Sequence, residues 1–278
     1  MRPSEVVLRA TRYLERHDVD SPRATAEVLL QHVLRTDRAG LYASPLDLST
    51  AEAKAFGRAL CRRCTGTPVQ HLTGRQAFRH IELEVRPGVF VPRPETETLV
   101  DVALEMVADL RAPVVVDVGT GTGAIGLAIK DERPDARVVG TDLSPEAVAL
   151  ARANAERLGL DVEIIHGDLL DTLPSGLRGG IDLVAGNPPY VDPDELVELP
   201  PEVQADPQLA LVGGIDVHRR LVAESPVWLR SESALVVEVG ATQGREVAAL
   251  FEDGGFGGVV VHADLAGRDR VVAGRLRG

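Results

Sequence analysis

The chain has 278 residues, 44% hydrophobic and 26% charged, so it is long enough to bury one large core and a second, smaller one. Its formal net charge of −12 argues against a broad nucleic-acid-binding surface. Two cysteines cannot form a disulfide framework, and neither a signal peptide nor an apolar run of membrane-spanning length is found. We therefore expect a cytoplasmic protein that contacts neither a membrane nor, directly, a nucleic acid.

Residues 1–72 are predicted to form a small helical domain. Ser21 and Pro22 have the residue types of a cap and a first-turn proline, so a helix is expected to begin there. Ser49 and Glu52 have the spacing of a capping box at the start of a second helix. The Thr-Gly-Thr-Pro sequence at 65–68 is expected to end that helix.

The two cysteines and two of the seven histidines are considered as possible metal or redox residues. Cys61 and Cys64 are interpreted as packing residues of the second helix, and a Cys-x-x-Cys redox pair or half of a zinc site is the alternative. His166 and His262 are interpreted as surface or core residues, because no other ligand type clusters with them. We predict no metal site.

Residues 73–92 are predicted to form a β-hairpin or linker. Residues 80–85 alternate apolar and polar side chains, as an exposed strand does, and residues 88–94 form an irregular, proline-containing loop. A helix is predicted over 95–110.

The remaining domain, residues 93–278, alternates short apolar runs with helical patterns. This order predicts an α/β fold in which helices cover both faces of a mainly parallel sheet. The last two strands are joined by a link too short for a crossover helix, so the final strand should be antiparallel. The seven predicted strands are 114–116, 137–140, 162–165, 181–185, 234–239, 259–261 and 271–272.

A glycine-rich loop follows the first of these strands and opens a helix. Its residues are Asp117, Gly119, Thr120, Gly121, Thr122 and Gly123. Such a loop lets the backbone approach a ligand closely, and residues 121–126 also match the weak dinucleotide pattern G-x-G-x-x-G. Asp142 ends the second strand, where a ribose would lie in either a dinucleotide or a nucleoside site.

Two carboxylates favour an adenosyl ligand with a cationic tail. Asp117 would repel a pyrophosphate but attract an ammonium or sulfonium group. Asp168 ends the third strand, where it suits an exocyclic adenine amine. We therefore predict that S-adenosylmethionine (SAM) binds here. A nicotinamide oxidoreductase is the alternative, but we find no acid or base for hydride transfer near the strand ends.

The fourth strand runs into the tetrapeptide Asn187-Pro188-Pro189-Tyr190. The Asn187 side-chain oxygen and the Pro188 carbonyl can both accept hydrogen bonds from one NH₂ group, while Tyr190 offers a flat wall. Holding both N–H bonds aims the nitrogen lone pair at an electrophile, so catalysis would depend on orientation rather than on a general base. Asn187, Pro188 and Tyr190 are the predicted catalytic residues.

These motifs resemble those of SAM-dependent amino-methyltransferases, and within them the HemK/PrmC family, which methylates the glutamine of the Gly-Gly-Gln loop in peptide chain release factors. The resemblance covers nearly the whole chain. Its motifs are Gly66-Thr67-Pro68-Val69-Gln70-His71-Leu72-Thr73-Gly74, Phe90-Val91-Pro92-Arg93-Pro94-Glu95-Thr96-Glu97, Gly119 to Gly126, Gly186 to Val191, Glu238-Val239-Gly240 with Gln243, and Asp264-Leu265 with Gly267 and Arg270.

The resemblance implies roles for individual residues. SAM would be held by Gly119, Thr120, Gly121, Thr122, Gly123, Asp142, Asp168, Leu169 and Asn187, and it would leave as S-adenosylhomocysteine. Asp117 is added to these cofactor-binding residues because of its expected attraction to the cationic tail. The glutamine would be held by Phe90, Arg93, Pro94, Glu95, Asn187, Pro188, Pro189 and Tyr190, and the loop from Phe90 to Thr96 would line the pocket. It also implies a Rossmann-like methyltransferase sheet of order 3-2-1-4-5-7-6, and docking of the release factor on residues 1–72. We expect a monomer.

The segment after Tyr190 departs from the family pattern. Where the family carries Glu-Pro, Ala-Leu and Gly-Gly-x-Asp-Gly, this chain has Asp206-Pro207, Ala210-Leu211 and Gly213-Gly214-Ile215-Asp216-Val217. The acidic residues of this segment are interpreted as a solvated loop: Asp192, Asp194, Glu195, Glu198, Glu202 and Asp206. The departures leave three alternatives to the release-factor substrate: a paralogue that methylates another amide or amine, a nucleic-acid amino-methyltransferase, and a catalytically silent SAM-binding protein.

Overall fold

The computed structural model describes the backbone of residues 1–278 and all side chains except those of residues 201 and 202. It contains two compact units, one formed by residues 1–75 and 200–205 and the other by residues 76–199 and 206–278. Within the described part of the chain, no helix has both the length and the apolar character needed to cross a membrane.

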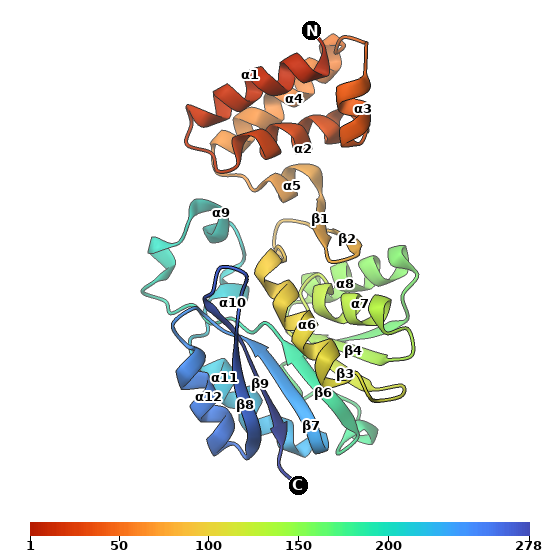
Figure 1. Cartoon of the computed structure of the whole chain (residues 1–278), viewed down its shortest axis with the longest axis vertical. Helices are drawn as coiled ribbons and strands as arrows, with labels where there is room; N and C mark the ends of the chain where they lie inside the picture. The colour runs from red at the N-terminus through yellow and green to blue at the C-terminus, as the bar shows by residue number, and fades with distance from the viewer. The chain divides into compact units, whose positions relative to one another are not determined.

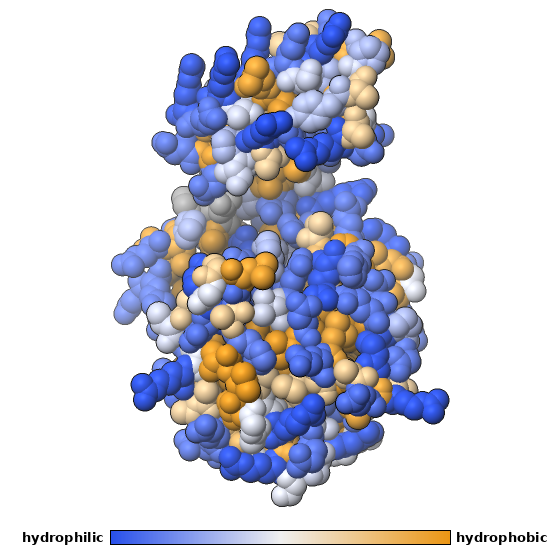
Figure 2. Space-filling model, in the orientation of Figure 1, coloured by the Kyte–Doolittle hydropathy of each residue, from blue (hydrophilic) through white to orange (hydrophobic). Residues whose placement is uncertain are grey.

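The first unit is a group of helices around a small apolar core. Leu14, Leu30 and Leu41 are fully buried there, and Phe56 completes the cluster. Polar and charged side chains cover most of this unit's face in the upper part of Figure 2. Its helices are α1 (Pro3–Glu15), α2 (Pro22–Leu34), α3 (Arg38–Ala43), α4 (Thr50–Cys64), α5 (Val69–Thr73) and α9 (Pro201–Gln204).

The two predicted helix starts differ in their caps. At α4 the capping box is present, since the Glu52 amide donates to Ser49 Oγ (3.2 Å) and the Ser49 amide donates to Glu52 Oε2 (2.7 Å). At α2, Pro22 begins the helix as predicted, but the expectation that Ser21 caps it is wrong. Ser21 has φ of 47°, in the left-handed region, whereas a capping side chain needs extended backbone to reach the first turn.

The chain continues after α5 with a hairpin of two short strands, β1 (Arg75–Phe78) and β2 (Ile81–Glu84). Phe78, Ile81 and Leu83 are buried in the core of the second unit. The alternation read from residues 80–85 therefore marks a strand with one buried side.

The second unit is a seven-stranded sheet of order β5-β4-β3-β6-β7-β9-β8, in which β9 is antiparallel to both neighbours. This order and the reversed last strand confirm the predicted fold class (Figure 1). The strands are β3 (Val114–Val118), β4 (Arg137–Asp142), β5 (Val162–His166), β6 (Ile181–Gly186), β7 (Leu229–Glu238), β8 (Phe256–Ala263) and β9 (Asp269–Leu276).

Helices cover both faces of the sheet. Because alternate residues of each strand point to opposite faces, each strand packs against both layers of helices. In β3, Val115 packs into the cluster that contains α6, α7 and the hairpin, whereas Val116 and Val118 pack into the cluster that contains α11 and α12. The helices are η1 (Pro94–Thr96), α6 (Glu97–Met106), α7 (Ala124–Glu132), α8 (Pro145–Leu158), η2 (Ser175–Leu177), η3 (Leu196–Glu198), α10 (Gln208–Leu211), α11 (Asp216–Glu224), η4 (Ser225–Val227) and α12 (Gly244–Asp253).

Candidate active site

The carboxyl ends of β3, β4, β5 and β6 border one cavity of about 300 Å³, which lies wholly in the second unit. Ligands of open parallel sheets bind at this edge, and the volume reaches the range of sites that enclose small molecules. The other walls come from the loop before α6 and from α10 and α11. The cavity is therefore the place to examine the residues singled out by the sequence.

The glycine loop after β3 forms one wall. Gly119, Thr120, Gly121 and Thr122 all line the cavity. Gly119 and Gly121 have φ of 67° and 58°, and a Cβ on either would meet a single protein atom within 4 Å, a backbone oxygen at 3.9 Å. The two glycines thus leave the space beside the loop to a ligand. Gly123, with φ of 88°, caps α7 and does not line the cavity.

Asp117 lies behind this loop rather than in the cavity. Its side chain is fully buried, and Oδ2 accepts hydrogen bonds from Thr120 Oγ1 (2.5 Å) and from the Gly126 amide (2.9 Å). Oδ1 is buried without a hydrogen-bond partner, and burial raises the pKa of the carboxyl to about 6. This geometry ties the loop to the start of α7, and it does not bring Asp117 to the cavity wall as the charge argument expects.

Asp142 and Asp168 line the cavity at the ends of β4 and β5, together with Leu169. Asp142 accepts hydrogen bonds from the amides of Gly121 and Ser144, each at 2.8 Å, and burial raises its pKa while those donors oppose the rise. Asp168 accepts a hydrogen bond from Arg220 of α11 at 3.0 Å, so one of its oxygens is already paired.

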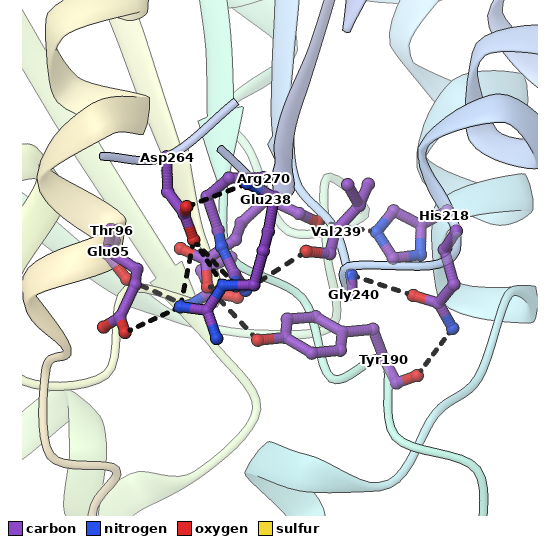
Figure 3. Close-up of polar contacts among 12 residues, drawn as sticks. Glu95, Thr96, Tyr190, His218, Glu238, Val239, Gly240, Asp264 and Arg270 are labelled. Carbon is purple, nitrogen blue, oxygen red and sulfur yellow. Dashed lines mark hydrogen bonds and ion pairs between the residues drawn. The ribbon is translucent and has the colours of Figure 1, made fainter. Parts of the chain in front are cut away.

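The tetrapeptide follows β6, and only part of it faces the cavity. Asn187 and Pro189 line the cavity, whereas Pro188 and Tyr190 do not. Asn187 donates from Nδ2 to Thr96 Oγ1 at 3.4 Å. Tyr190 points toward Glu238 and donates to its Oε1 at 3.2 Å (Figure 3). The Tyr190 ring thus belongs to a buried polar cluster rather than to the lining of the cavity.

Of the predicted substrate-binding residues in the loop before α6, only Phe90 lines the cavity, with Pro92 and Thr96 beside it. Arg93 lies 5.4 Å from the Phe90 ring centroid and pairs with Asp206. Pro94 begins the short helix η1. Glu95 forms an ion pair with Arg268 at 3.6 Å.

The acidic segment after Tyr190 is not uniformly solvated. Asp192, Asp194, Glu195 and Glu198 are exposed, as expected, but Asp206 is buried. The expectation for Asp206 is wrong because Arg93 and the Val91 amide provide the partners that let a carboxylate leave water. The Glu202 side chain lies outside the described residues.

Two residues of this region were missed by sequence reasoning as individual contributors: Arg220 and Glu238. Thr96 ends the loop that was expected to line the pocket, and it does line the cavity. Glu238 lies inside a motif that carries the family resemblance, so a signal for it existed. Arg220 follows the departing segment, and nothing in the sequence pointed to it.

The described side chains contain no group of three or more His, Cys, Asp or Glu that could hold a metal ion. Cys61 is exposed and Cys64 half-buried on α4, both as free thiols. His166 is exposed and contacts the Leu143 carbonyl at 3.0 Å, and His262 lies on β8; neither lines the cavity.

The site can therefore hold a ligand along the glycine loop and present an amide to a second group. Asp142 and Asp168 place hydrogen-bond acceptors at two strand ends, and Asn187 lines the same cavity. Chemically, these groups can accept hydrogen bonds from a ligand and donate them to it.

Comparison with known proteins covers both units. Residues 5–74 match the PrmC N-terminal domain, and residues 81–199 match the methyltransferase small domain. A release factor glutamine methyltransferase of Deinococcus radiodurans is 41% identical, over 100% of each chain. The enzyme of that name from Mycolicibacterium smegmatis is 43% identical, over 95% of this chain and 94% of its own.

The fold is also shared with a solved structure. The ribosomal protein L11 methylase of Lactobacillus delbrueckii subsp. bulgaricus aligns with a TM-score of 0.52 at 19% identity, over 70% of this chain and 84% of its own. That likeness concerns the fold alone. The identity to the full-length relatives is what decides the family: the chain belongs to the release factor glutamine methyltransferases.

Proposed function

We propose that this protein transfers a methyl group from SAM to the side-chain amide nitrogen of the glutamine in the Gly-Gly-Gln loop of peptide chain release factors. The observation that carries the proposal is that Asn187 and the glycine loop line one cavity in a chain of this family. Full-length relatives named for this activity favour it over the paralogue, nucleic-acid and silent alternatives.

The residues present fit SAM. Open space beside Gly119 and Gly121 admits a ligand against the backbone, and Asp142 can accept hydrogen bonds from ribose hydroxyls. Asp168 keeps one oxygen for the adenine amine while Arg220 holds the other. Bound there, SAM supplies an electrophilic methyl carbon on a sulfonium.

The tetrapeptide would orient the substrate amide. Asn187 Oδ1 and the Pro188 carbonyl accept the two N–H bonds of the glutamine, which turns the nitrogen lone pair toward the methyl carbon. The C–N bond forms as the C–S bond breaks, and one amide proton then leaves to water. Neither step needs a general base in the protein, and the two carboxylates that line the cavity, Asp142 and Asp168, are assigned to the ribose and to the adenine amine.

We also propose that the helical unit docks the release factor, and that the protein works as a cytoplasmic monomer without direct contact to nucleic acid. The match of residues 5–74 to the PrmC N-terminal domain supports a role for this unit that is particular to the family. The net charge of −12 supports the absence of nucleic-acid binding.

The test is to incubate the protein with SAM and unmethylated release factor and to locate the methyl group by peptide mass spectrometry. We expect one methyl on the Gly-Gly-Gln glutamine. Asn187→Ala should abolish it, whereas Arg137→Ala, at the opposite end of β4 and exposed, should not change it. A methyl on another residue, or none from the wild type, would contradict the proposal.

A further inference from the structure

A buried polar cluster lies beneath the tetrapeptide, at the ends of β7 and β9. Glu238 is 1% exposed and Arg270 8% exposed. Arg270 Nη1 lies 3.9 Å from Glu238 Oε1, and Arg270 Nη2 lies 3.3 Å from Asp264 Oδ2 (Figure 3). Burying a carboxylate is costly unless it is paired and hydrogen-bonded, so the groups that contact Glu238 indicate what it is retained for.

Glu238 contacts both ends of the substrate-orienting machinery. The Tyr190 hydroxyl donates to Oε1 at 3.2 Å. The Thr96 hydroxyl lies near enough to act as a donor that lowers the pKa of the Glu238 carboxyl. Thr96, itself 3% exposed, lines the cavity and accepts from Asn187 Nδ2 at 3.4 Å. One carboxylate thus faces the tyrosine of the tetrapeptide directly and its asparagine through Thr96.

The direction of these hydrogen bonds has a consequence for Asn187. An ionised carboxylate can only accept, so the single hydroxyl proton of Thr96 turns toward Glu238 when that group is ionised. The Thr96 oxygen is then left as an acceptor, and Asn187 must turn its NH₂ group toward it. The Asn187 Oδ1 is consequently free for the N–H bond of a substrate amide.

The segment that follows Glu238 also holds the backbone of Tyr190. Gln243 donates from Nε2 to the Tyr190 carbonyl at 2.9 Å and accepts the Gly240 amide at 3.0 Å. The Glu-Val-Gly-x-x-Gln motif at 238–243 therefore holds Tyr190 at two points, its hydroxyl and its carbonyl.

We infer that Glu238 is a positioning residue for methyl transfer, which sets the Asn187 amide through Thr96 and fixes Tyr190 through its hydroxyl. The inference rests on the proposed function. It names the residues that hold the Asn187 side-chain amide in one orientation. Arg270, held by Asp264, keeps a positive charge beside the carboxylate.

The charge state of Glu238 decides which way Thr96 points. Burial raises the pKa of Glu238 to about 7, against the hydrogen bonds of Thr96 and Tyr190 and the charge of Arg270. A protonated Glu238 can donate to Thr96, which frees the hydroxyl proton to face Asn187 Oδ1. The titratable or charged groups that face this carboxyl or its backbone are Arg270, Asp264, Tyr190, Glu95 and, on the backbone carbonyl, His218.

The test compares Thr96→Val, which removes the hydroxyl, with Thr96→Ser, which keeps it. We expect Thr96→Val to lower kcat on release factor about 10- to 100-fold. The dissociation constant of this variant for SAM, measured by calorimetry, should stay within about twofold of the wild-type value. Thr96→Ser should retain at least a third of the wild-type rate. Equal losses in both variants would assign the effect to packing and overturn the inference.

Two further measurements separate positioning from support of the fold. The wild-type rate should rise with pH through about 7, and Glu238→Gln should abolish this rise. The double variant Thr96→Val with Glu238→Gln should be no slower than the slower single variant, because both changes break one chain of hydrogen bonds. Additive losses would contradict that.

A readout that does not depend on turnover is the side-chain NH₂ resonance of Asn187. It should shift in Thr96→Val, and in the wild type it should titrate near pH 7, but not in Glu238→Gln. A wild type that leaves the release factor unmethylated would refute the proposed function, whereas an active wild type whose Asn187 resonance ignores Thr96→Val would refute this inference alone.

Discussion

The guanidinium of Arg93 pairs with the fully buried carboxylate of Asp206, which lies 113 residues further along the chain. Asp206 also accepts the Val91 amide at 3.2 Å. The pair therefore joins the loop that carries Phe90 and Pro92 to the start of α10, and both segments line the cavity.

Removing Arg93 should leave a buried carboxylate unpaired. We expect Arg93→Ala to lower the free energy of unfolding by about 2–4 kcal/mol, measured by urea denaturation. Arg86→Ala, which removes an exposed pair with Glu84, should cost about 1 kcal/mol or less. Adding Asp206→Asn to Arg93→Ala should recover part of the loss, and no recovery would contradict the account of the buried charge.

Asp142 both holds the glycine loop and faces the cavity. Asp142→Ala removes the acceptor of the Gly121 amide and the proposed ribose contact, so the dissociation constant for SAM should rise about 10- to 100-fold. Isothermal titration calorimetry measures this, with Asp161→Ala, an exposed site before β5, as the control. Unchanged affinity in Asp142→Ala would remove Asp142 from the proposed site.

Asn154 of α8 joins the hairpin to the glycine loop. Fully buried, it donates from Nδ2 to the carbonyls of Glu84 and Thr122, each at 3.0 Å, and accepts the Glu84 amide at 2.8 Å. Asn154→Leu has a similar volume but strands three backbone groups, so it should cost about 3 kcal/mol of unfolding free energy. The exposed neighbour Glu156, changed to Ala, should stay within about 0.5 kcal/mol.

The pKa of Asp117 predicts a pH dependence of stability. Because burial raises this pKa to about 6 in the folded protein, the group favours the folded state below its ordinary value near 4, and this contribution is lost as pH rises through 6. The stability of the wild type relative to Asp117→Asn should therefore fall between pH 4 and 6.5, by an amount on the order of 3 kcal/mol. Urea unfolding of both proteins across this range checks it, and a constant difference would show that Asp117 does not titrate there.

Local patterns predicted the sheet well. Short, largely apolar runs such as 181–185 are typical of strands buried on both faces, and the short link after β8 favours an antiparallel β9. Helices α10 and α11 were not predicted, since α10 spans four residues and α11 follows a departing segment. Their role in lining the cavity was missed with them.

Contacts between distant segments could not be predicted in this way. The burial of Asp206 depends on Arg93, and the pairing of Asp168 depends on Arg220, 52 residues later. Asp117 illustrates a second limit, because its residue type and place in the motif gave the carboxylate but not the side of the loop on which it lies. The strand ends, the glycine loop and Asn187 were brought together by topology alone.

The most direct measurement is a crystal structure of the protein with S-adenosylhomocysteine and a peptide containing Gly-Gly-Gln. The account predicts the nucleoside along Gly119–Thr122 with its ribose at Asp142. It also predicts the glutamine NH₂ within hydrogen-bond distance of both Asn187 Oδ1 and the Pro188 carbonyl. A glutamine bound elsewhere, or an Asn187 amide that presents Nδ2 to it, would contradict the account.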